Sequence, residues 1–151
     1  MANYVNSIAG VALSTSADLR TIYTTATGAG SVVALKELYL SGEAGSSAYN
    51  RVIVNRPGTA GITPTAGTIG LLHPASAAAA FGVATTWATQ PVWSATDVLV
   101  PGLNAFAGQV RWVAPVGAEI FVGSQGAVAN LSIGSRSGTS TVSGHVIIEQ
   151  A

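Results

Sequence analysis

The sequence contains no cysteine and very few charged residues. Without cysteine it can form neither a disulfide framework nor a thiolate site for zinc. Charged residues make up 8% of the 151 positions, against about 25% in an average protein, and the formal net charge is zero. Because binding to nucleic acid needs clustered cations that displace counterions, one lysine and five scattered arginines argue against a nucleic-acid partner.

Long apolar runs and targeting features are also missing. No stretch approaches the 18 uninterrupted apolar residues of a transmembrane helix, so we expect no membrane span. Residues 1–7 lack the basic and apolar regions of a signal peptide. We therefore expect the protein to be made and folded in the cytoplasm of the producing cell, without a membrane partner.

Small residues dominate what is present. Alanine, glycine, serine and threonine together account for 74 of the 151 residues, yet 48% of the chain is hydrophobic, which is typical of a folded protein. The length fits one domain, residues 1–151. Residues 1–12 precede the first regular pattern, so we expect an N-terminal arm whose first seven residues can be removed without unfolding the subunit.

Strand-forming residues outnumber helix formers, and turn residues recur every few positions. We expect strands at residues 19–25, 32–41, 48–55, 92–100, 109–114, 119–123, 127–133 and 142–150, with a short one at 68–72. A turn at Arg56-Pro57-Gly58 should end the third strand. Residues 76–82 fit either one or two helical turns or an ordered loop. Eight or nine strands at this spacing indicate an all-β antiparallel sandwich or barrel.

The longest strand contains a break in its alternation. Its apolar residues follow one phase at Val33 and Leu35 and the other phase at Leu38 and Leu40. A β-bulge at Lys36-Glu37 would produce this one-residue shift, whereas a strand buried on both faces is the alternative.

The sequence offers no convincing catalytic or metal site. His145 and Glu149 lie on one face of the last strand, but about 13 Å apart, too far for a hydrogen bond. No nucleophile elbow, phosphate loop or calcium loop occurs, so we expect no enzyme activity, no cofactor and no metal. A glycosidase would need two of the six carboxylates to meet in space.

The low charge points instead to association. An uncharged surface rich in apolar atoms promotes contacts between proteins. Trp87 and Trp93 flank the turn Gln90-Pro91 and are candidates for an interface, whereas Trp112 alternates with Val110 and fits a core.

Several segments resemble a group of small tailed-bacteriophage virion proteins. They are residues 13–23 (LSTSADLRTIY), 35–42 (LKELYLSG), 72–78 (LHPASAA), 111–120 (RWVAPVGAEI) and 142–149 (VSGHVIIE). The resemblance is one of strand pattern and implies a jelly-roll sandwich, a homotrimer, and a role in decorating or cementing the capsid by contact with the major capsid protein. It implies no catalytic residues.

We therefore expect a non-enzymatic virion protein on the capsid surface. Its candidate interface residues are Tyr4, Trp87, Trp93 and Phe106. The alternative is a receptor- or glycan-binding fibre head of similar β-sandwich fold. A tryptophan exposed beside polar groups in a pocket would favour the fibre head, and tryptophans buried between subunits would favour decoration.

Overall fold

The computed structural model describes residues 1–24, 32–122 and 130–151, and these form an all-β protein, as the sequence predicts. No helix that could span a membrane occurs among them. The strands are β1 (Ala2–Ala12), β2 (Arg20–Thr24), β3 (Val33–Glu43), β4 (Tyr49–Thr59), β5 (Ile62–Ala66), β6 (Gly70–Leu71), β7 (Phe81–Thr89), β8 (Val92–Leu99), β9 (Gly102–Asn104), β10 (Phe106–Val113), β11 (Ile120–Phe121), β12 (Asn130–Ser137) and β13 (Thr141–Gln150).

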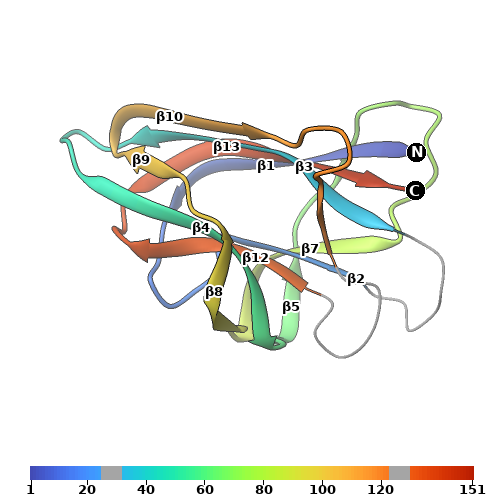
Figure 1. Cartoon of the computed structure of the whole chain (residues 1–151), viewed down its shortest axis with the longest axis horizontal. Coiled ribbons are helices and arrows are strands. Elements are labelled where there is room, and N and C mark those ends of the chain that lie inside the picture. Colours follow the sequence, from blue (N-terminus) through green and yellow to red (C-terminus); the bar gives the residue numbers. More distant parts are fainter. Residues whose placement is uncertain (25–31, 123–129) are drawn as a thin grey trace.

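The strands build two antiparallel sheets that pack face to face as a β-sandwich (Figure 1). Sheet A has the order β10-β3-β13-β1-β6, and the short β11 also pairs with β3. Sheet B has the order β5-β7-β2-β12-β4-β8, and the short β9 also pairs with β4. Most of the predicted strands are therefore present. Residues 25, 123 and 127–129 of three of them lie outside the described residues. The sandwich is the correct choice over the barrel.

The core lies between the two sheets and follows from strand alternation. Inward-facing residues of β1, β3 and β13 meet those of β2, β4 and β12, and almost all are aliphatic. In β13, for example, Val142, Val146 and Ile148 are fully buried. Trp112 packs against this core beside Val110, as its position in the sequence predicts.

A bulge in β3 explains the break in alternation. Ile147 of β13 pairs with Glu37 and Ile148 pairs with Leu35, so Lys36 is the extra residue. This confirms the bulge over a strand buried on both faces. Leu35 and Leu38 both face the core, while the bulge places Glu37 on the outer face of sheet A.

The end of β4 and the loop before β7 differ in part from the sequence prediction. The strand at 48–55 does not end at Arg56-Pro57-Gly58, because β4 continues to Thr59. Pro57 is tolerated there because the ladder with β8 shifts register on both sides of it, so no regular backbone hydrogen bond is lost. Residues 72–80 form turns and loop and β7 begins at Phe81, so of the two alternatives for 76–82 the loop is correct up to residue 80 and the helical turn is wrong.

The expected N-terminal arm is wrong. Ala2–Ala12 form β1, which lies inside sheet A between β13 and β6. Tyr4 and Ile8 point into the core, and the Tyr4 hydroxyl donates to the carbonyl of Ala77 at 2.7 Å. The sequence disguises this strand because small and polar residues interrupt its few apolar positions.

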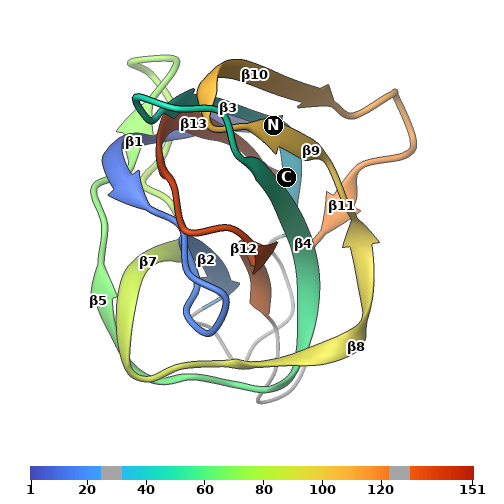
Figure 2. The ribbon, with the colours of Figure 1, turned by 90° about the vertical axis from the view of Figure 1, so that its left-hand side faces the viewer.

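The outer strands of sheet B curl toward each other on the side away from sheet A. In Figure 1 and Figure 2 the connections β4–β5 and β7–β8 lie below β2 and β12. Gly61, in the first connection, lies so close to Trp87 and Pro91 that a Cβ there would stand 2.5 Å from the indole. The outer face of β2 and β12 is therefore partly enclosed, which positions the polar residues described next.

Removal of residues 1–7 should unfold the subunit. The deletion takes Tyr4 from the core and removes the pairing of β1 with half of β13, and loss of a large buried aromatic alone costs about 3–5 kcal/mol. Circular dichroism during heating would measure this. A control deletion of Met1 and Ala2 should retain cooperative unfolding; retained cooperative unfolding of the longer deletion would contradict the assignment of β1.

Candidate functional site

A buried carboxylate organises the enclosed face of sheet B. Asp18, which is 7% exposed, accepts hydrogen bonds from the Thr21 and Ser132 hydroxyls and from the Trp93 indole N–H. The Thr21 hydroxyl in turn accepts the indole N–H of Trp87 at 2.8 Å. One carboxylate therefore fixes both tryptophans that the sequence singled out.

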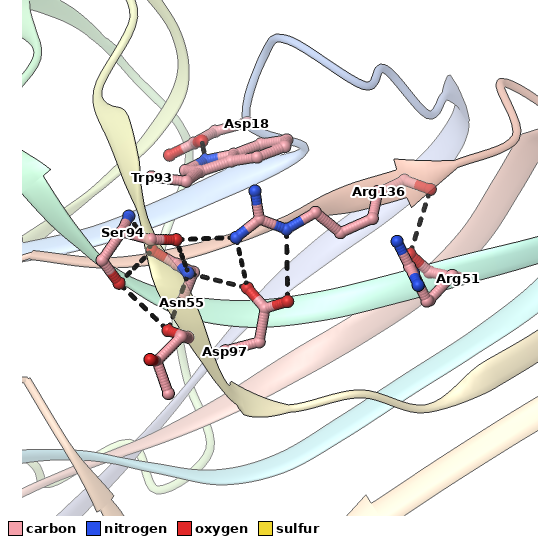
Figure 3. Close-up of polar contacts among 9 residues, drawn as sticks. Asp18, Arg51, Asn55, Trp93, Ser94, Asp97 and Arg136 are labelled. Carbon is pink, nitrogen blue, oxygen red and sulfur yellow. Dashed lines mark hydrogen bonds and ion pairs between the residues drawn. The ribbon is translucent and has the colours of Figure 1, made fainter.

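An arginine and a second carboxylate lie on the other side of Trp93 (Figure 3). The guanidinium of Arg136 lies over the indole, 5.4 Å from its centroid, and its Nη2 is 2.8 Å from Asp97 Oδ1. Asn55 Nδ2 donates to the same Asp97 oxygen at 2.7 Å. The ring can lie flat on β12 because residue 134 is glycine; a Cβ there would come within 2.4 Å of it.

The two carboxylates have opposite pKa shifts. Burial raises the pKa of Asp18, although its three hydrogen-bond donors oppose the rise. Burial acts in the same direction on Asp97, but there the hydrogen bonds and charge of Arg136 outweigh it and lower the pKa.

The outer face of sheet A carries a second polar cluster. Glu37 accepts from Arg111 Nε at 2.9 Å and from Arg111 Nη2 at 3.0 Å, and its Oε1 is 3.1 Å from His145 Nε2. The ring of Tyr39 stacks on His145 with centroids 5.4 Å apart. These residues and Ile147 line a shallow hollow of about 410 Å³.

The contacts within this cluster hold Glu37 as an anion. The partner of His145 is Glu37 on a neighbouring strand, and Glu149 instead lies 3.6 Å from Lys36. The hydrogen bonds from Arg111, aided by His145, lower the pKa of Glu37, so this carboxylate stays ionised and cannot serve as a general acid at neutral pH. No group of three or more side chains suited to a metal ion occurs within the described residues.

Most charged side chains of the protein form ion pairs or are buried. Lys36 pairs with Glu119 and Glu149, Arg111 with Glu37, and Arg136 with Asp97. Asp18 and Arg20 are buried. Of the twelve charged side chains, all of which are described, those left exposed outside any ion pair are Glu43, Arg51 and Arg56.

Several exposed apolar residues belong to strands and connections along one flank of the sandwich. We define the β8–β11 flank by seven exposed apolar residues that lie between the second half of β8 and β11 or at the start of β4, which pairs with β9: Tyr49, Val98, Val100, Phe106, Val113, Val116 and Phe121. Both sheets end here, because β10 is the edge of sheet A and β8 the edge of sheet B (Figure 2).

The structure places the predicted interface residues in different surroundings. Tyr4 is 1% exposed and Trp87 is buried, so both belong to the interior of the subunit. Trp93 is half-buried on β8, and its indole N–H is already used by Asp18. Phe106 is 59% exposed on the β8–β11 flank. For Trp93 and Phe106 a role at an interface stays a prediction.

Sequence reasoning did not find the central residues of either cluster. Asp18 meets partners 75 and 114 residues away, and Glu37 meets Arg111 at a separation of 74. No local spacing reveals such pairs. The bulge at Lys36-Glu37 is the one signal that could have drawn attention to Glu37.

Comparison with known proteins adds no relative. No family model matches the chain, and searches of curated proteins and of solved structures give no significant match.

Replacement of Asp18 by asparagine should change how stability depends on pH. Because the folded-state pKa is raised, the stability that this carboxyl contributes is full below the unfolded pKa of about 3.9 and is lost as pH rises through the folded pKa. In urea unfolding from pH 3 to 7, the wild-type free energy of unfolding should therefore contain a decrease with rising pH that comes from Asp18. This decrease should be absent in Asp18→Asn.

Asp97→Asn is the matched control, for which the expected pH dependence has the opposite direction. Because the pKa of Asp97 is lowered, this carboxylate contributes stability above about pH 3.9, and this stability is lost as pH falls through the folded pKa. Parallel pH profiles for the two variants would contradict the opposite environments described above.

Proposed function

We propose that the protein is a non-enzymatic structural protein of a tailed-phage virion, a homotrimer that decorates or cements the capsid surface through contacts with the major capsid protein. The resemblance of its strand pattern to that group of virion proteins supports the proposal. The mechanism is burial of apolar area between neighbouring capsomers. At about 25 cal/mol per Å², a few hundred Å² per contact yields several kcal/mol before the cost of association.

The strand order supports a jelly roll. In this fold the first, eighth, third and sixth strands form one sheet, and the second, seventh, fourth and fifth form the other. If β1, β2, β3, β4, β8, β10, β12 and β13 are taken as the eight strands, the observed orders β1-β13-β3-β10 and β2-β12-β4-β8 correspond to this pattern. The remaining strands then lie in the connections, with β5, β6 and β7 in one insertion.

The observation that carries the proposal is the β8–β11 flank. Seven exposed apolar side chains lie where the edges of both sheets are open, on a protein whose charges are mostly paired or buried. Exposed apolar patches and unprotected edge strands are costly in a protein that stays monomeric. An interface along this flank would cover both features at once.

The flank predicts the effect of a single charge. In sedimentation equilibrium at micromolar concentration the wild-type protein should have three times the 15.0 kDa mass of one chain. Phe106→Asp should shift the mass toward one chain, because a carboxylate at a dry interface loses its hydration. Ile62→Asp is the control, since Ile62 is 61% exposed on β5, the edge of sheet B opposite β8.

Two results would count against assembly through this flank. One is a wild-type monomer throughout the concentration range, and the other is equal dissociation by the two variants. The place of the trimer is tested by electron cryomicroscopy of virions that contain this chain. The proposal expects its density on the outer capsid surface, and density at a fibre tip would favour the receptor-binding alternative.

A further inference from the structure

A buried arginine lies at the open side of the sandwich opposite the β8–β11 flank. Arg20 is the first residue of β2 and faces inward, toward β1 of the other sheet, where an aliphatic residue would be expected. It is only 6% exposed. Its guanidinium donates to Asn6 Oδ1 at 2.8 Å, to the Leu19 carbonyl at 2.7 Å and to the Ser7 carbonyl at 3.3 Å.

This arginine has no anionic partner in the chain. The structure describes all six carboxylate side chains, and none lies within 4 Å of Arg20. Its three acceptors are neutral oxygens, so three of the five N–H donors are satisfied but the positive charge is not compensated. Burial lowers the pKa of the guanidinium, but an arginine remains protonated in any case.

An uncompensated charge in the interior is unfavourable. Removal of an ion from water costs several kcal/mol, and buried charges are normally paired for this reason. The other buried or half-buried cations follow this rule, because Lys36 and Arg136 each have a carboxylate at 2.8 Å. Arg20 departs from it, so an anion supplied from outside the chain would stabilise this guanidinium.

A pocket leads from the surface to this guanidinium. It has a volume of about 330 Å³ and lies between β1, β7 and the connection from β5 to β6. Its lining contains no carboxylate and consists of Val5, Asn6, Ser7, Arg20, Thr68, Gly70 and Thr85. The charge of the lining is therefore that of Arg20 alone, and the hydroxyl residues add polar character.

The pocket wall is held in place by specific contacts. Asn6, which is 3% exposed, accepts from Arg20 with its oxygen and donates from Nδ2 to the Thr68 carbonyl at 2.7 Å. Gly67 allows the β5–β6 connection to pack closely against Thr85 and Asn6, because a Cβ at residue 67 would be 2.9 Å from the first and 3.2 Å from the second. The amide of Gly67 also donates to the Val83 carbonyl at 2.7 Å. Asn6 thus links the arginine to the rim of the pocket.

We propose that this pocket binds a small oxyanion, such as a carboxylate, phosphate or sulfate group, on the two unused N–H donors of Arg20. A guanidinium matches these anions because its planar donors reach two oxygens at once. The volume accommodates either a planar carboxylate or a tetrahedral anion. This inference does not depend on the proposed assembly, because the pocket lies at the opposite side of the sandwich from the β8–β11 flank.

Nuclear magnetic resonance titration of the intact chain tests the site directly. Sodium phosphate, sodium sulfate and sodium acetate are added separately, with sodium chloride replaced to keep the ionic strength constant. We expect saturable shifts of the amide resonances of Asn6, Ser7, Thr68, Gly70 and Thr85 with at least one of the three anions. A response to acetate alone identifies a carboxylate ligand, and a response to phosphate or sulfate identifies a tetrahedral one. Heating experiments should show the melting temperature rising by about 5–10 °C at about 100-fold excess over Kd.

Two variants separate the site from general charge effects. Arg20→Gln should abolish saturation, whereas Arg51→Gln, at an exposed arginine of β4, should leave it unchanged. If Arg20→Gln fails to fold, Thr68→Phe serves in its place, because it narrows the mouth of the pocket and leaves Arg20 intact. Thr68→Phe should weaken anion binding at least about 10-fold. Its control is Thr96→Phe, which should leave binding unchanged; the Thr96 carbonyl accepts from Asn55 just as the Thr68 carbonyl accepts from Asn6.

The proposal is overturned by any of three results. They are the absence of a saturable shift at these five amides with all three anions, shifts that sodium chloride reproduces, and saturation that persists unchanged in Arg20→Gln or Thr68→Phe. A monomer in sedimentation equilibrium would count against the proposed assembly alone and would not bear on anion binding.

Discussion

The packing of two apolar sheet faces is the interaction on which the rest of the structure depends. Because alternate residues of each strand must point inward, the core fixes the register of every strand and thereby sets which side chains meet outside. The bulge at Lys36 shows this constraint at work. It returns Leu38 and Leu40 to the core and places Glu37 outward, where Arg111 and His145 reach it from neighbouring strands.

Most of the few ionic side chains are either paired or buried. Three clusters pair opposite charges on the outer faces, so the exterior is left mostly to small and apolar side chains. The two charges buried without an ionic partner lie at the start of β2. Asp18 is surrounded by hydroxyl and indole donors, and Arg20 opens onto a pocket. The donors around Asp18 fix its position in the fold, and Arg20 is open to a ligand.

The sequence predicted the fold class and most strands, because alternation and turn residues are local signals. It even located the bulge at Lys36-Glu37. It missed β1, β5, β7 and β9. Few apolar residues mark these strands among small, polar and turn-forming ones, so that only pairing with neighbouring strands reveals them. It also missed Asp18, Arg20 and Glu37 as centres of clusters. Their partners come from other strands, and no spacing within one segment encodes such a meeting.

The most direct test of the assembly account is hydrogen exchange, measured by mass spectrometry over a range of protein concentrations. Edge strands exchange quickly unless something covers them. The account predicts that exchange in β10 (Phe106–Val113) slows as concentration rises, while exchange in the opposite edge strand β5 (Ile62–Ala66) stays unchanged. Equal behaviour of the two edges, or protection of β5 alone, would contradict an interface along the β8–β11 flank.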